Sequence, residues 1–252
     1  MSIQSLEHAA ATAAWVSAAL RGVCSVEQTL DVINGLDGPS PLTDFVPHDE
    51  SEPIALAFAI ARWRRQGVPG WRYLPVAPGD AAGLPGPARF STSVLDRGVG
   101  LLAAGSESLG LVTEVSEPGL VWREYQTDST VLASVVSASE AERQLLDALN
   151  GSVDLLNRLD LSDWRPNTSD VRHEWFDPTP MPAGTGHRAE RLALRSRRIL
   201  QVVEVATVDD GGSRTLTEMQ ARGATLTELA RTARQAHAAA WNTPLHEATE
   251  RR

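Results

Sequence analysis

The chain has 252 residues, of which 42% are hydrophobic and 22% are charged, and its formal net charge at pH 7 is −9. This composition is typical of a globular protein and excludes a collagen, a disulfide-stapled miniprotein and a disordered tail. All 23 basic residues are arginine. Because lysine is absent, the sequence excludes Schiff-base lysine chemistry, a P-loop lysine and the lysine that holds phosphates in kinases.

The single cysteine, Cys24, excludes an intramolecular disulfide and every site that needs two thiolates, such as zinc fingers and most iron–sulfur centres. We interpret it as a buried structural thiol. The longest apolar run, residues 54–61, is too short to span a bilayer, and no basic residue of the kind that opens a secretory signal precedes Arg21. The sequence therefore predicts a soluble cytoplasmic protein without a membrane partner.

Helical apolar spacing in the first third of the chain predicts helices over residues 4–21, 25–34 and 53–66. Ser25, followed by Gln28 three residues later, fits a capping box at the start of the second helix. The third helix is apolar all round, which predicts that it is buried.

The middle of the chain has strand-like patterns at residues 71–76, 109–115 and 120–126. The last two patterns alternate and are joined by a turn sequence, which predicts an antiparallel pair. A loop rich in Gly and Pro over residues 77–89 leads into a short helix near Ser91 or Ser93.

The last part of the chain returns to helical spacing. We expect helices at about 139–160, 187–207 and 225–241 and a shorter piece near 215–222. Ser139, Thr215 and Thr225 each precede a glutamate by three residues, as in a capping box. A polar, Pro-containing stretch over 162–186 has no clear period and is long for a connection in a compact domain.

These elements together predict an α+β fold that is predominantly helical. A small three-stranded sheet, formed by about residues 71–126, is expected to pack between N-terminal and C-terminal helices. We expect one integrated domain over 1–252. The alternative is an α+β part over 1–130 and a helical part over 139–252, with 162–186 as a long loop.

Two arginine-rich segments stand out in this acidic chain. The first surrounds the 77–89 loop, where Arg72 and Arg89 flank a strand-to-helix connection that also contains Asp80. Because a helix N-terminus offers free N–H groups, these residues and the loop amides could bind a small anion. The glycine spacing matches neither the dinucleotide-binding nor the P-loop motif, so a rigid surface connection remains the alternative.

The second arginine-rich segment is residues 187–200. Four of its arginines recur at helical spacing and form one stripe, made by Arg188, Arg191, Arg195 and Arg198. The stripe could bind phosphates of a nucleic acid. The alternative is a solvated face that pairs with the acidic middle segment or with a second subunit. The negative net charge favours the second interpretation and makes nucleic acid an unfavourable partner.

His173, Asp177 and His187 form the only dense group of histidines and carboxylates in the chain. His173 and Asp177 would share a helical face, so with His187 they could act as an acid/base pair or as two-His-one-carboxylate ligands. The prolines at 178, 180 and 182 shorten any helix there, and a solvated loop is the alternative. We expect no bound metal and no cofactor.

No strong catalytic constellation emerges, and the sequence leaves open whether the protein is an enzyme. Our leading hypothesis is a non-catalytic interaction or regulatory protein that self-associates through its Ala-rich C-terminal helices. The alternatives are an anion-binding enzyme or sensor that uses the 77–89 loop, and a nucleic-acid-binding protein that uses the arginine stripe.

Overall fold

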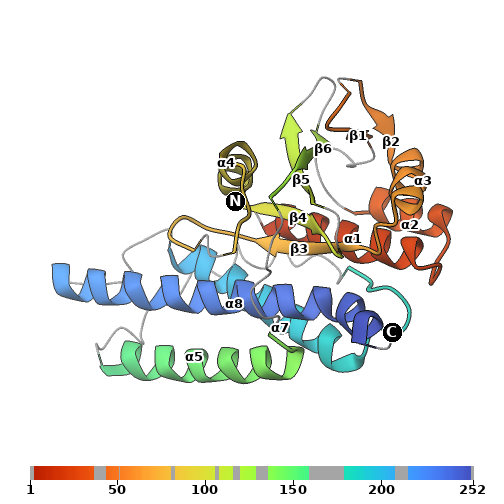
Figure 1. Ribbon diagram of the computed structural model, residues 1–252. Coiled ribbons are helices and arrows are strands. Elements are labelled where there is room, and N and C mark those ends of the chain that lie inside the picture. The colour runs from red at the N-terminus through yellow and green to blue at the C-terminus, as the bar shows by residue number, and fades with distance from the viewer. Residues whose placement is uncertain are drawn as a thin grey trace. The chain divides into compact units, whose positions relative to one another are not determined.

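The computed structural model describes residues 3–36, 44–50, 52–80, 83–105, 108–115, 120–128, 136–158, 179–207 and 215–250 (Figure 1). The chain divides into two compact units. Unit 1 comprises residues 1–135, 179–186 and 241–252, and unit 2 comprises residues 136–178 and 187–240. One integrated domain over the whole chain stays a prediction, as does the alternative division near residue 130.

Unit 1 is built from helices and a sheet. Its elements in chain order are α1 (Ile3–Leu20), α2 (Val26–Asn34), β1 (Asp44–Val46), β2 (Ile54–Ala55), α3 (Leu56–Gln66), β3 (Trp71–Pro75), α4 (Ala88–Arg97), β4 (Val99–Ala103), β5 (Leu109–Val115) and β6 (Leu120–Gln126).

The sheet has six strands in the order β2-β1-β6-β5-β4-β3, so the expected small three-stranded sheet is wrong. It is a mixed sheet, because β1 pairs with β6 in parallel whereas the other neighbours are antiparallel. The expected antiparallel pair is confirmed as β5 and β6, with Val112 opposite Arg123.

Three strands, β1, β2 and β4, were not predicted, because their sequences lack the alternation of polar and apolar residues that indicates a strand. Every residue of β4 is buried, so its sequence has no polar face and no alternation. β1 and β2 have three and two residues, which is too short for a periodic signal. The parallel partner of β1 lies far along the chain, at β6.

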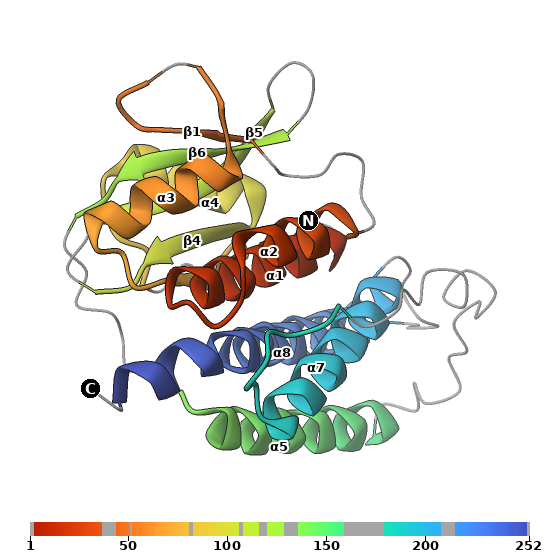
Figure 2. The same ribbon diagram turned by 90° about the vertical axis from the view of Figure 1, so that its right-hand side faces the viewer.

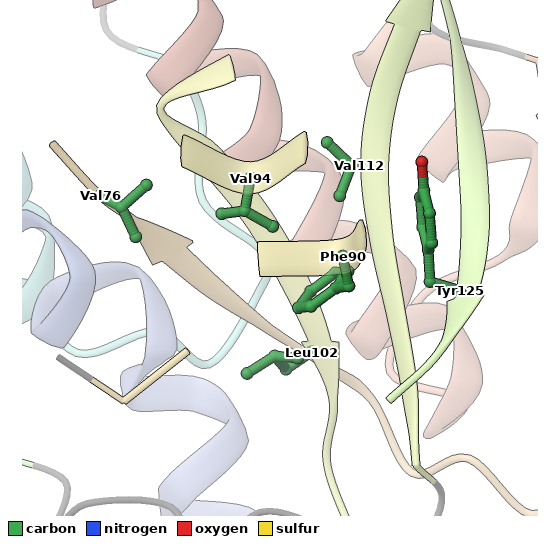
Figure 3. Close-up of a cluster of buried hydrophobic side chains, with 6 residues drawn as sticks. All are labelled: Val76, Phe90, Val94, Leu102, Val112 and Tyr125. Atoms are coloured by element: carbon green, nitrogen blue, oxygen red, sulfur yellow. The ribbon is translucent and has the colours of Figure 1, made fainter. Parts of the chain in front are cut away.

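The two faces of the sheet carry different helices (Figure 2). Side chains of α4 pack on one face in a cluster formed by Val76, Phe90, Val94, Leu102, Val112 and Tyr125 (Figure 3). α3 covers the opposite face. There the centroid of the Trp63 ring lies 4.9 Å from the centroid of the Phe45 ring and 4.8 Å from that of the Trp71 ring. α3 begins at Leu56 rather than at Pro53, and its Phe58 is 71% exposed, so the expectation of a helix buried all round is wrong.

Unit 2 is helical. It contains α5 (Ala138–Arg158), α7 (His187–Ala206) and most of α8 (Leu216–Glu250), whose last residues belong to unit 1. Its core is a cluster of Val203, Ala206, Leu226 and Leu229. The expected pieces near 215–222 and 225–241 are one helix, α8. Among the residues described, no helix is long and apolar enough to cross a membrane.

Candidate functional site

The residues expected to form an anion site beside the 77–89 loop lie on β3, in a turn and on α4. Arg72 lies on β3, and the Nε of its guanidinium is buried without a hydrogen-bond partner among the described residues. Burial lowers the pKa of Arg72 below the usual arginine value. The guanidinium of Arg89 instead lies over the Tyr125 ring, 5.6 Å from its centroid.

Asp80, the third residue of this group, lies in a tight turn in which its backbone N–H donates to the Ala77 carbonyl over 2.9 Å. Residues 81 and 82 lie outside the described residues. The helix that follows the loop begins at Ala88, earlier than expected, and Ser91 donates from its hydroxyl to the Pro85 carbonyl over 2.8 Å.

A polar cluster that the sequence did not indicate surrounds Tyr125 on the α4 side of the sheet. Its hydroxyl donates to Glu114 Oε1 and lies 3.2 Å from the Ser93 hydroxyl, while Arg123 Nε donates to Glu114 Oε2 over 2.5 Å. Burial and the hydrogen bond to Glu114 raise the pKa of Tyr125. The cluster is assembled by strand alternation, which places Glu114, Arg123 and Tyr125 on one face.

Of the expected group of His173, Asp177 and His187, the structure describes His187 alone. His173 and Asp177 lie outside the described residues. His187 is the first residue of α7, its side chain is 92% exposed, and its Nδ1 lies 3.1 Å from Glu190 Oε2. Within the described ranges, no three His, Cys, Asp or Glu side chains are grouped closely enough to hold a metal ion.

Two members of the arginine stripe face a carboxylate on α5. Arg195 Nη1 lies 3.2 Å and Arg188 Nε 3.6 Å from the two oxygens of Glu142. Arg191 and Arg198 are exposed. Such ion pairs contribute little to stability at a surface, but they bring the arginine face of α7 beside α5.

α5 and α7 also carry exposed apolar side chains, which we together call the α5–α7 surface: Leu146 and Val153 on α5, and Val202 on α7. Their exposed fractions are 39%, 49% and 57%. Leu146 follows Glu142 by one helical turn and Val153 follows Leu146 by two, whereas Val202 lies two turns after Arg195. The Glu142–Arg195 pair therefore joins the two faces that carry these apolar side chains.

A second arrangement, which pattern analysis missed, is centred on Glu124 of β6. Its side chain is fully buried, and His48 Nδ1 lies 2.8 Å from its Oε1. The indole Nε1 of Trp63 donates to its Oε2 over 3.0 Å. His48 and Glu124 are 76 residues apart in the sequence, so only the pairing of β1 with β6 brings them together.

The described residues thus define a two-unit α+β protein, in which a mixed sheet with its covering helices belongs to one unit and a helical core to the other. The N-terminal domain of the Rv1486c-like proteins matches residues 9–142, and the C-terminal domain of the same proteins matches residues 139–238. The chain belongs to the Rv1486c-like family. No curated protein and no solved structure gives a significant match.

Proposed function

We propose that the protein is a non-catalytic cytoplasmic interaction protein that self-associates through the α5–α7 surface. The observation that carries the proposal is the exposure of Leu146, Val153 and Val202 on two adjacent helices of one unit. Exposed apolar side chains favour a partner that covers them, because the contact removes their apolar area from water. The anion-site and nucleic-acid hypotheses have less support, since the Arg89 guanidinium lies over the Tyr125 ring and Glu142 pairs with two arginines of the stripe.

The Ala-rich part of α8, where the sequence placed the contact, is a poor candidate. Its alanines at 233, 236, 239 and 240 are no more than 7% exposed, so they are already buried within the chain. A partner must instead use side chains that remain accessible, which favours α5 and α7.

The charges on α5 favour a second copy of the same chain as the partner. Arg143 lies one turn before Leu146 and its side chain is 66% exposed, whereas the exposed Asp154 follows Val153 directly. Two α5 helices packed antiparallel would place Leu146 against Val153 of the other copy and Arg143 near its Asp154. Such a contact is self-complementary, as a twofold dimer requires.

Sedimentation velocity across a concentration series tests the proposal. The wild-type protein should show a reversible monomer–dimer equilibrium, and Leu146→Glu should weaken it by about tenfold or more, because the contact would bury an unpaired carboxylate. Phe58→Glu is the matched control, since Phe58 is the most exposed of the large apolar residues described but lies on α3. A wild-type monomer at high micromolar concentration, or equal weakening by Phe58→Glu, would contradict the proposal.

A charge exchange tests the antiparallel arrangement separately. Arg143→Asp and Asp154→Arg should each weaken the dimer, because each places like charges opposite one another, and the double variant should restore it. If the double variant does not recover affinity, the antiparallel register of the two α5 helices is excluded. The sedimentation of Leu146→Glu still tests whether the α5–α7 surface is the contact.

A further inference from the structure

The contact between His48 and Glu124 joins a buried carboxylate to a partly exposed imidazole. The Glu124 side chain has no exposed surface, and that of His48 is 29% exposed. An ionised carboxylate without water is costly unless hydrogen bonds and an opposite charge compensate it. Trp63 Nε1 and His48 Nδ1 supply the hydrogen bonds, over 3.0 and 2.8 Å.

Among the ion pairs of the described residues, the one that Glu124 makes is with His48. Arg62 on α3, which precedes Trp63, pairs with other carboxylates: its Nη2 lies 2.8 Å from Asp49 Oδ1 and its Nη1 3.1 Å from Glu50 Oε1. Asp49 Oδ1 lies 3.9 Å from His48 Nδ1, so a second carboxylate faces the same ring nitrogen. The charge of His48 therefore decides whether Glu124 is neutralised.

The other ring nitrogen of His48 has a partner that can serve both charge states. Its Nε2 lies 3.1 Å from the Gln126 side-chain amide nitrogen, which can donate to a neutral imidazole. A half-turn of that amide presents its oxygen instead, which can accept from the protonated Nε2. Protonation therefore requires no displacement of the ring.

The contact lies where the sheet has little backbone pairing. His48 follows β1 by two residues, and β1 is registered to β6 at Phe45 and Val46 only and to β2 at two positions. A short terminal ladder opens more easily than the long β5–β6 pair, because fewer hydrogen bonds must break. A side-chain contact from His48 to β6 thus adds to a weak attachment.

We propose that His48 and Glu124 form a proton-dependent clasp that holds β1 and β2 to the sheet. The groups that set its charge balance are His48, Glu124, Asp49, Arg62 and Glu50. When the imidazole is protonated, the hydrogen bond to Glu124 joins two opposite charges and the strand is held firmly. When the imidazole loses its proton, the hydrogen bond remains but the charge pairing is lost, and the edge opens more often. Histidine is the side chain that ordinarily changes charge between pH 5 and 8.

Amide hydrogen exchange measured by NMR tests the clasp. After correction for intrinsic exchange rates, amides of residues 44–46 and 54–55 should be roughly fivefold better protected at pH 5.5 than at pH 8, because a charge-assisted hydrogen bond is stronger than a neutral one. Amides of β4 are the internal reference and should show no comparable change. Equal pH dependence in β1 and β4 would overturn the proposal.

Two variants extend the test. His48→Asn keeps an N–H donor near the position of Nδ1 but has no titrating charge, so the pH dependence of β1 protection should disappear. His187→Asn removes another histidine that contacts a carboxylate, at an exposed position on α7, and should leave it unchanged. Persistence of the pH dependence in His48→Asn would also overturn the proposal. If that variant does not fold, the comparison of amide protection in β1 and β4 of the wild type tests the proposal by itself.

Discussion

Asn242 on α8 forms both of the hydrogen bonds that a further strand would otherwise make with Tyr73 on β3. The Tyr73 N–H donates to Asn242 Oδ1 and the Asn242 Nδ2 donates to the Tyr73 carbonyl, each over 2.9 Å. β3 is the last strand of the sheet. Two residues before Tyr73, the Trp71 N–H donates to the hydroxyl oxygen of Ser17 on α1 over 2.7 Å. Both side chains close an edge that would otherwise offer unpaired backbone groups to another chain.

Replacing Asn242 with alanine should lower the free energy of unfolding by about 2–4 kcal/mol, because two buried backbone groups of Tyr73 lose their partners. Asn242→Asp should also destabilise, since it keeps the acceptor for the N–H but sets an oxygen against the carbonyl. Chemical denaturation followed by tryptophan fluorescence measures both. Gln66→Ala, at an exposed helix end, is the control. An Asn242→Ala protein as stable as that control would show that the edge contact is unimportant.

Gly110 on β5 allows α4 to pack closely on the sheet. A methyl group at this position would lie 2.4 Å from Phe90 Cε2, which is closer than any real contact. Gly110→Ala should therefore destabilise the protein by about 1–3 kcal/mol through overpacking. Thermal or chemical unfolding of the purified variant gives the measurement.

The matched control for Gly110 is Gly151 in the interior of α5, where an added methyl group meets nothing within 4 Å. Gly151→Ala should stabilise by roughly 0.5–1 kcal/mol, because alanine loses less backbone freedom than glycine in a helix. Opposite signs for the two substitutions are the expected result. If both substitutions destabilise the protein, the loss of stability in Gly110→Ala cannot be assigned to the close packing of Phe90 against Gly110.

Glu114 should make stability depend on acid pH. Burial alone raises the pKa of Glu114, but hydrogen bonds from Tyr125 and Arg123 and the charges of Arg123 and Arg89 outweigh burial and hold this pKa below its usual value. A lowered pKa in the folded state means that the unfolded chain binds the proton more readily. The carboxylate therefore contributes stability above the pKa of an unfolded glutamate, about 4.3, and that contribution is lost as the pH falls through the folded pKa.

Glu114→Gln should accordingly be less stable than the wild type at pH 7, and the difference should shrink as the pH falls below about 4. Unfolding curves measured from pH 7 to pH 2.5 test this. Glu52→Gln, at an exposed position, should differ little from the wild type at any pH. A constant difference between Glu114→Gln and the wild type would show that the lost packing, not the charge, matters.

The sequence predicted those parts of the fold that local patterns encode. β5 and β6 alternate because each has one face on α4 and the other toward α3, and their predicted bounds agree with the structure. The cap of α2 is confirmed, because Ser25 Oγ accepts from the Gln28 N–H over 3.0 Å. β4 was missed because a strand buried on both faces has no period, and β1 because its partner lies far along the chain.

The contacts of the candidate sites were less predictable, because they depend on which strands and helices become neighbours. Nothing in the local sequence of Glu124 distinguishes it from other polar residues in a strand, yet parallel pairing of β1 brings His48 to it. The spacing of the arginine stripe was visible in the sequence. That Glu142 contacts two of its members follows only from the packing of α5 on α7.

Thr215 and Thr225 begin the same sequence pattern, Thr-x-x-Glu, but only the first acts as a helix cap. At Thr215 the bonds are reciprocal: its N–H donates to Glu218 Oε2 over 3.1 Å, and the Glu218 N–H donates to its hydroxyl oxygen over 3.2 Å. Thr225 lies inside α8, where its hydroxyl donates to the Ala221 carbonyl over 2.8 Å. The pattern alone cannot show whether a helix has already begun.

The two threonines should therefore respond differently to alanine. Thr215→Ala removes a cap and should lower stability by about 0.5–2 kcal/mol, with faster amide exchange in the first turn of α8. Thr225→Ala replaces a β-branched residue in a helix by the best helix former and should be neutral or slightly stabilising. Chemical denaturation of both variants, together with amide exchange at residues 216–219, gives the comparison. Equal losses at the two positions would mean that the reciprocal bonds at Thr215 add nothing to the stability of α8.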